Sequence, residues 1–132
     1  MYKLVLKWEF SSAHQLTNAY AKECNDNLHG HNWEVEIMIK TRELVNGMVV
    51  DFKQLKEIVN KLDHKNLNTI FSFEPTAENI TKYLYMEVVG LLKGRLYEAE
   101  VTVWEAKGNS ITYSNYKFHK IFEFSMTDPN FP

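Results

Sequence analysis

Two long stretches of the chain alternate between apolar and polar residues, which restricts it to folds built on paired β-strands. The first covers about residues 2–14, with most apolar side chains at even positions. The second runs from about His29 or His31 to Lys40, with apolar side chains at odd positions. Successive side chains of a strand point to opposite faces, so each stretch presents one face to a core and one to water. The sequence predicts two long strands joined by a polar loop.

Two helices are predicted in the middle of the chain. Asp51 has the side chain of an N-cap, and it precedes an apolar stripe at helical spacing that contains Phe52, Leu55, Ile58, Val59 and Leu62. Thr76 is the expected cap of the second helix, and Gly94 is expected to end it. The inward side of this helix is expected to carry Ile80, Tyr83, Leu84, Val88 and Leu91.

Two further strands are expected in the C-terminal part, over about residues 98–105 and 111–118, with Asn109 in the turn before the second. Asn46-Gly47 is a strong signal for a tight turn. Together these elements predict a single domain over residues 1–132. It belongs to the α+β class, with an antiparallel sheet and helices on one face.

Charge and cysteine content exclude several classes of protein. The chain has 15 basic and 17 acidic residues and a formal charge of −2, so no nucleic-acid partner is expected. No stretch approaches the roughly 18 uninterrupted apolar residues of a membrane helix, and the N-terminus lacks the form of a signal peptide. The single cysteine, Cys24, suits a reducing compartment. We expect a cytoplasmic protein with no membrane partner, whose short chain favours subunit association.

Three histidines stand where the two long strands meet the loop between them. His14 closes the inward row of the first strand, and His29 and His31 open that of the second, with fourteen residues between His14 and His29. Residues two apart on a strand share a face, and Gly30 between them lets the backbone pass tightly. Three imidazoles with no fourth ligand nearby and an open position are typical of a catalytic zinc.

Two other interpretations of these histidines remain open. Each histidine can be an isolated polar residue at a strand end. Alternatively, Cys24 can be a fourth ligand, which would make the site structural because structural zinc sites are closed by four protein ligands.

The order of motifs along the chain resembles the 6-pyruvoyl-tetrahydropterin synthase family, which includes the 6-carboxytetrahydropterin synthases of the queuosine pathway. The motifs are His14, Cys24-x4-His29-Gly30-His31-Asn32, Leu62-Asp63-His64, Pro75-Thr76-Ala77-Glu78-Asn79 and Val103-Trp104-Glu105. The resemblance implies a tunnelling fold, with a four-stranded antiparallel sheet and two helices on one face. It also implies homotrimers, commonly stacked as homohexamers, with active sites at subunit boundaries.

The resemblance also implies a role for each motif residue. The zinc ligands are His14, His29 and His31; the general base is Cys24, with Asp63 and His64 as its relay; the pterin anchor is Glu105, helped by Thr76 and Glu78 of a neighbouring subunit. Without the resemblance, Asp63 and His64 are equally well explained as residues of a solvent-exposed loop. Glu105 is then explained as a residue at a strand end whose side chain faces water. Glu78 is equally explained by the preference of acidic residues for helix N-termini.

Three features depart from the family pattern. Four residues separate Cys24 from His29, whereas the carboxy-type enzymes more often have three and the animal pyruvoyl-type enzymes five. Ala106 stands where the family often has threonine. The tail beyond Tyr116 is longer than in many short members.

The expected reaction is the zinc-dependent conversion of 7,8-dihydroneopterin triphosphate to 6-carboxy-5,6,7,8-tetrahydropterin, with loss of acetaldehyde and triphosphate. Zinc would act there as a Lewis acid on the hydroxyl groups of the pterin side chain. The alternatives are the pyruvoyl-type elimination of triphosphate and a non-catalytic zinc- or pterin-binding module. A generic zinc hydrolase ranks last, because no carboxylate stands beside the His-x-His.

Overall fold

The two long strands form an antiparallel pair that organises the rest of the chain. Residues 1–17 and 27–114 are described by the computed structural model, and within them β1 (Tyr2–His14) and β2 (His29–Thr41) pair along their whole length. The register places Tyr2 opposite Thr41 at one end and His14 opposite His29 at the other. Both strands agree with the ranges predicted from the alternation of residues.

The sheet has five strands in the order β3-β1-β2-β4-β5. Strand β4 (Glu98–Ala106) pairs antiparallel with β2, and β5 (Asn109–Tyr113) pairs antiparallel with β4. Strand β3 (Lys65–Asn66) pairs parallel with β1. The expectation of a four-stranded, purely antiparallel sheet was therefore wrong, and the sheet is mixed.

The extra strand forms because the chain after the first helix is hydrogen-bonded to the edge of β1. The backbone N–H of Ser11 donates to Asp63 Oδ1 at 2.8 Å, and the N–H of His64 donates to the Ser11 carbonyl at 2.6 Å. These bonds align Lys65 with Ser12. A two-residue strand is too short to produce a recognisable alternation, so its sequence carried no signal.

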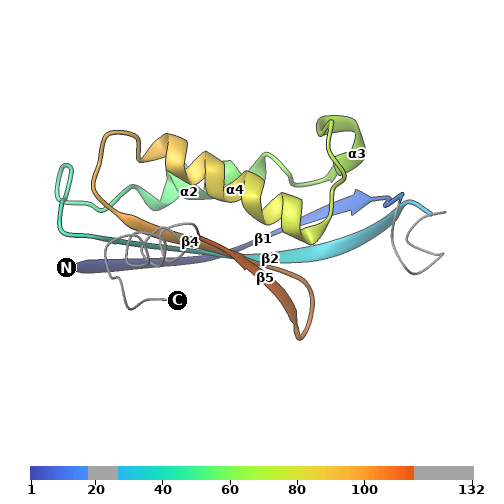
Figure 1. Cartoon of the computed structure of the whole chain (residues 1–132), viewed down its shortest axis with the longest axis horizontal. Helices are drawn as coiled ribbons and strands as arrows, with labels where there is room; N and C mark the ends of the chain where they lie inside the picture. The colour runs from blue at the N-terminus through green and yellow to red at the C-terminus, as the bar shows by residue number, and fades with distance from the viewer. Residues whose placement is uncertain (18–26, 115–132) are drawn as a thin grey trace, which may run out of the picture.

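Helices cover one face of the sheet (Figure 1). Helix α2 (Phe52–Asn60) is capped by Asp51, whose side chain accepts from the Lys53 N–H, and α4 (Ala77–Leu91) is capped by Thr76, as predicted. A third helix, α3 (Leu67–Ile70), is a single turn capped by Asn66, and the sequence analysis did not predict it. None of the helices in the described ranges is long and apolar enough to cross a membrane.

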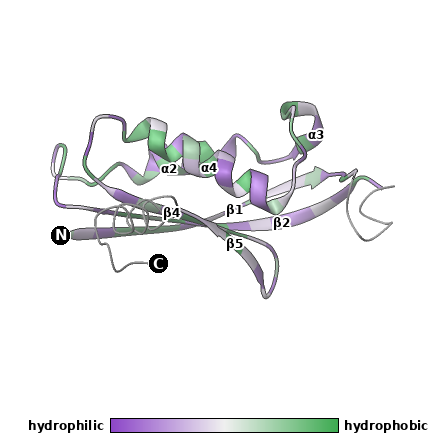
Figure 2. Cartoon of the chain, in the orientation of Figure 1, coloured by the Kyte–Doolittle hydropathy of each residue, from purple (hydrophilic) through white to green (hydrophobic). Residues whose placement is uncertain are grey.

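The core lies between the helices and the covered face of the sheet. Both α2 and α4 carry hydrophilic as well as hydrophobic residues (Figure 2), and their buried members pack on the strands. The largest fully buried apolar side chains are Trp33, Phe10, Ile37, Ile39, Leu55, Leu62, Leu67, Ile80, Leu84 and Leu92. The predicted inward row of β1 is buried at Leu4, Leu6 and Phe10.

Trp8 departs from this inward row, since its side chain is 38% exposed. Its indole N–H donates to Asn60 Oδ1 at 2.8 Å, and the Lys56 ammonium lies 4.5 Å from the ring centroid. Strand β3 covers β1 only at Ser12 and Ala13. Trp8 therefore lies at an uncovered stretch of the sheet edge, where its polar N–H finds a partner on α2.

The turns agree only partly with the sequence analysis. Val45 and Met48 exchange two backbone hydrogen bonds around Asn46 and Gly47, which have φ of 53° and 78°, so this turn is confirmed. Asn109, however, is already paired in β5. The strand expected over residues 111–118 is described only to Tyr113, and positions 115–118 lie outside the described residues.

We predict that Asp51→Ala lowers the free energy of unfolding by about 1 kcal/mol, because the Lys53 N–H at the start of α2 loses its acceptor. Urea denaturation measures the change. Asp51→Asn is the matched control and keeps most of the stability, since asparagine also caps helices well. Equal midpoints for the alanine variant and the unmodified protein would contradict the capping role.

Candidate metal centre

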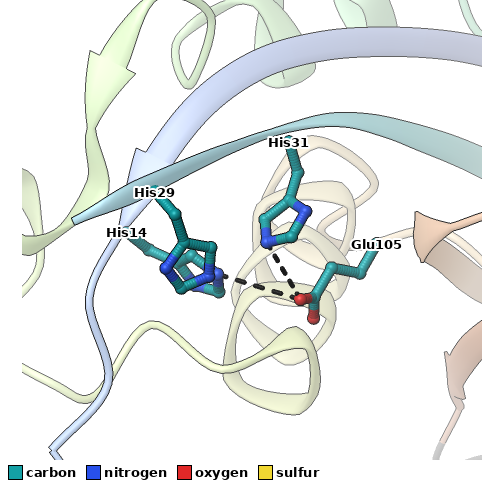
Figure 3. Close-up of side chains that lie close together, drawn as sticks. All are labelled: His14, His29, His31 and Glu105. Atoms are coloured by element: carbon teal, nitrogen blue, oxygen red, sulfur yellow. Dashed lines mark ion pairs between the residues drawn. The ribbon is translucent and has the colours of Figure 1, made fainter. Parts of the chain in front are cut away.

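The three histidines converge at the open end of the β1–β2 pair. His14 lies opposite His29, and His31 lies opposite Ser12, one step further along the same face. The ring centroid of His14 lies 4.5 Å from that of His29 and 5.0 Å from that of His31. His29 and His31 are 4.9 Å apart by the same measure. The convergence predicted from the spacing is confirmed, and Figure 3 shows the three rings gathered in one place.

Backbone carbonyls orient two of the rings. His14 Nδ1 lies 2.8 Å from the Pro75 carbonyl oxygen, and His29 Nδ1 lies 3.0 Å from that of Asn27. A carbonyl only accepts, so in each ring Nδ1 carries the proton and the neutral imidazole keeps its lone pair at Nε2. Among the described residues, Nε2 of His14 has no hydrogen-bond partner although it is buried. This is the arrangement of metal-ligating histidines, whose other nitrogen donates to a fixed acceptor.

Trp33 packs against two of the histidine rings. Its ring meets the rings of His14 and His31 edge-on, at centroid distances of 5.1 Å and 5.2 Å. Trp33 itself is fully buried, stacks on Phe10 at 5.7 Å, and donates from Nε1 to the Ser12 carbonyl at 3.3 Å. This contact restricts the rings of His14 and His31. Trp33 belongs to the odd-numbered apolar row expected for the second strand, but its support of the site was not predicted. Its position two residues after His31, on the same face, was the available signal.

A carboxylate completes the cluster. Glu105 Oε1 lies 3.0 Å from His31 Nε2 and 3.9 Å from His14 Nε2 (Figure 3). One ligand atom from each of the four residues lies within 4.8 Å of the others. No fourth ligand beside the three histidines was expected from their spacing, whereas the structure places Glu105 among them.

Sheet geometry explains how Glu105 arrives there. Val103 on β4 pairs with Val35 on β2, and Glu105 continues the same face towards Trp33 and His31. The register between β4 and β5 shifts between Trp104 and Ala106, so Glu105 occupies a bulge. Bulges commonly re-aim a side chain next to a functional site. The inward row ending at Glu105 was visible in the sequence, whereas the pairing that brings it to the histidines was not.

Burial favours the neutral form of two of the imidazoles, those of His14 and His31. It lowers the pKa of His14, against the opposing effects of the Pro75 hydrogen bond and of Glu105. Burial also lowers the pKa of His31, with Glu105 again opposing. Metal ions bind the neutral form of histidine, so both rings retain the binding-competent form to lower pH than a free imidazole does.

The donor set fits a metal ion of the zinc type. Three imidazole nitrogens and one carboxylate oxygen are ligands that zinc accepts in a four-coordinate site. The proton positions fit as well, because the two carbonyl-bound rings direct their lone pairs away from the backbone. The cluster could therefore hold one metal ion.

Asp63 and His64 lie outside this cluster. Asp63 is bound through Oδ1 to the Ser11 N–H, and its Oδ2 lies 3.5 Å from His64 Nε2. The His64 side chain is 84% exposed, and its backbone has a positive φ of 56°. The pair predicted from the sequence is thus in contact, with the imidazole presented to the surface.

Thr76 and Glu78 stand at the start of α4. Thr76 Oγ1 accepts from the Asn79 N–H at 3.1 Å, so its hydroxyl serves as the helix cap. Glu78 lies in the first turn and is exposed. Thr76 follows Pro75, whose carbonyl orients His14, which places the start of α4 beside the metal cluster. Cys24, the predicted base, lies outside the described residues.

Comparison with known proteins places the chain in a family. The sequence model described as 6-pyruvoyl tetrahydropterin synthase matches residues 3–116. A protein of Archaeoglobus fulgidus, provisionally named 6-carboxy-5,6,7,8-tetrahydropterin synthase, is 41% identical over 97 residues, which cover 69% of this chain and 81% of that protein. The dihydroneopterin monophosphate aldolase of Pyrococcus furiosus is 32% identical, over 78% of this chain and 89% of its own.

Two eukaryotic proteins extend the comparison. The 6-pyruvoyl tetrahydrobiopterin synthase of Dictyostelium discoideum is 33% identical, over 79% of this chain and 89% of its own. The structure of Caenorhabditis elegans 6-pyruvoyl tetrahydropterin synthase shares the fold, with a TM-score of 0.67 and 24% identity over 86% of this chain and 94% of its own. The chain belongs to the 6-pyruvoyl tetrahydropterin synthase family.

Proposed function

We propose that this chain is a zinc-dependent lyase that converts 7,8-dihydroneopterin triphosphate to 6-carboxy-5,6,7,8-tetrahydropterin. The observation that carries the proposal is the convergence of His14, His29 and His31, with two of the rings oriented by backbone carbonyls. The similarity to the Archaeoglobus fulgidus protein supports the carboxy-type reaction. The three histidines would hold the zinc ion.

The balance of the reaction defines what the site must do. Cleavage of the bond between the first and second side-chain carbons releases the two outer carbons as acetaldehyde, and cleavage of the C–O bond releases triphosphate. One water supplies the second carboxyl oxygen, and the ring gains the two hydrogens that the oxidised side-chain carbon gives up. Zinc, when bound, supplies Lewis acidity towards the side-chain oxygens. The protein must therefore hold the pterin ring and move protons on its side chain.

Glu105 is the proposed anchor of the pterin ring. An ionised carboxylate accepts two hydrogen bonds side by side, and the pterin presents its amino group and a ring N–H in that arrangement. Because Glu105 lies at the end of β4, beside His31, a ring bound to it would lie next to the histidine cluster. Thr76 and Glu78 of a neighbouring subunit would assist.

Cys24, Asp63 and His64 are the proposed proton-transfer residues. Cys24 would take a proton from the substrate at its thiolate sulfur, which a neighbouring metal and imidazole favour. Asp63 Oδ2, 3.5 Å from His64 Nε2, would orient that imidazole for proton relay. Because His64 is exposed and outside the histidine cluster, we propose that it acts at a boundary between subunits of a homotrimer or homohexamer in the cytoplasm.

The relatives favour two other reactions as alternatives. The Dictyostelium discoideum name supports elimination of triphosphate to a pyruvoyl product. The Pyrococcus furiosus name supports an aldol cleavage of dihydroneopterin monophosphate, which would release glycolaldehyde phosphate. A non-catalytic zinc- or pterin-binding module is the remaining alternative, and it predicts Cys24 among the metal ligands and no turnover.

We predict that the purified protein releases acetaldehyde and triphosphate in equal amounts from 7,8-dihydroneopterin triphosphate. Chromatography of the pterin, an aldehyde assay and metal analysis of the same sample provide the measurement. Triphosphate without acetaldehyde would move the protein to the pyruvoyl reaction. Glycolaldehyde phosphate from the monophosphate substrate would identify it as an aldolase, and the carboxy-type proposal would be wrong in both cases.

We predict that His29→Ala lowers the affinity for zinc at least tenfold, because one of the three converging imidazoles is lost. Chelator competition measures the affinity, and circular dichroism checks the fold. His64→Ala is the matched control, since it removes an exposed imidazole outside the cluster and keeps the metal. Equal zinc affinity for the two variants would contradict the proposed ligand set.

We predict that Cys24→Ala keeps its zinc and loses a factor of about 10² to 10⁴ in kcat, the range typical for removal of a general base. Zinc content and turnover are measured on one preparation. Loss of zinc together with activity would instead assign Cys24 to the metal, as the binding-module alternative requires.

A further inference from the structure

The nitrogen of His14 that faces Glu105 carries no proton. His14 Nδ1 donates to the Pro75 carbonyl, so Nε2 bears a lone pair, and this lone pair lies 3.9 Å from Glu105 Oε1. His31 Nε2 is only 3.0 Å from the same oxygen, yet it makes no hydrogen bond within the described residues. A nitrogen lone pair that faces a carboxylate is repelled by it, and a cation between the two turns that repulsion into attraction.

The spacing of these atoms matches a four-coordinate site. Zinc lies about 2.0–2.1 Å from each nitrogen ligand and about as far from carboxylate oxygen, so the corners of its tetrahedron are roughly 3.3–3.4 Å apart. The two measured distances from Glu105 Oε1, 3.0 Å and 3.9 Å, fall on either side of this value. Small side-chain rotations would place Oε1 at the fourth corner.

Glu105 is held less firmly than His14. His14 is fully buried and fixed at Nδ1, whereas the Glu105 side chain is 33% exposed and sits on a bulge beyond the last β2–β4 pair. Its carboxylate has no hydrogen-bond or ion-pair partner other than His14 and His31 in the part of the chain that the structure describes. The Glu105 side chain can therefore leave the cluster while the buried His14 ring stays in place.

We infer that Glu105 is an exchangeable fourth metal ligand, which closes the histidine site in the absence of substrate and leaves it to bind the pterin ring. The inference rests on the proposed function for the metal and for the pterin, and adds that one carboxylate serves both in turn. The fourth position then becomes available only when the pterin has drawn Glu105 away. The site is closed at rest and open during turnover.

Zinc affinity tests the first half of this exchange. Glu105→Gln removes the charge and weakens one ligand with little change of shape, so zinc affinity falls about tenfold or more by chelator competition, and the cobalt(II)-substituted protein changes its visible absorption. Glu34→Gln is the matched control, because Glu34 makes the same charge change on the opposite, exposed face of β2. Equal zinc affinity and identical cobalt spectra for Glu105→Gln and the unmodified protein would overturn the inference.

A pterin without a side chain tests the second half. Unsubstituted pterin reaches Glu105 but offers no hydroxyl groups to the metal, so metal and pterin compete for one carboxylate. Pterin should therefore bind more tightly to the metal-free protein than to the zinc-loaded protein, and by linkage it should weaken zinc binding by the same factor. Fluorescence titration of both forms gives the two affinities. Equal or tighter binding to the zinc-loaded form would overturn the exchange.

These outcomes separate the inference from the proposed function. Failure of the unmodified protein to bind zinc would overturn the metal centre and the exchange together. Zinc binding and pterin turnover with no effect of Glu105→Gln on zinc affinity would leave the proposed function intact and overturn the exchange alone.

Discussion

The register between β1 and β2 is the constraint on which the site depends. Because side chains alternate between faces, a slip of one residue would turn every inward side chain of one strand to the open face. The pairing of His14 with His29 therefore sets both the core and the histidine cluster, since Leu6, Phe10 and His14 lie on one continuous face. Burial of the apolar part of this face stabilises the register, and the histidines at its end follow from it.

Contacts from other parts of the chain orient the histidine rings that the register brings together. The carbonyls of Pro75 and Asn27 choose the tautomer of two rings. Trp33 limits the rotation of His14 and His31 from below. Glu105 arrives from a third strand, at a bulge, with a side chain that keeps some freedom. The cluster thus combines a buried, hydrogen-bonded imidazole at His14 with a partly exposed carboxylate at Glu105.

Much of this architecture was predictable because it depends on local patterns. Alternation identified β1 and β2, caps identified the starts of α2 and α4 at Asp51 and Thr76, and the spacing of the histidines predicted their convergence. Strand β3 and helix α3 were missed because two and four residues are too few to show a period. The place of Glu105 was missed for another reason: it follows from pairing between β2 and β4, which are far apart in the sequence.

The peptide unit at Pro75 has a consequence for how the protein can vary. Its carbonyl orients His14, while the adjacent Thr76 begins α4. The position of α4 on the sheet and the orientation of the His14 ring are therefore linked. Lengthening or shortening the connection from α3 to α4 would turn the His14 ring without replacing any residue of the centre. Loop length, and not only residue identity, therefore affects the geometry of the histidine cluster.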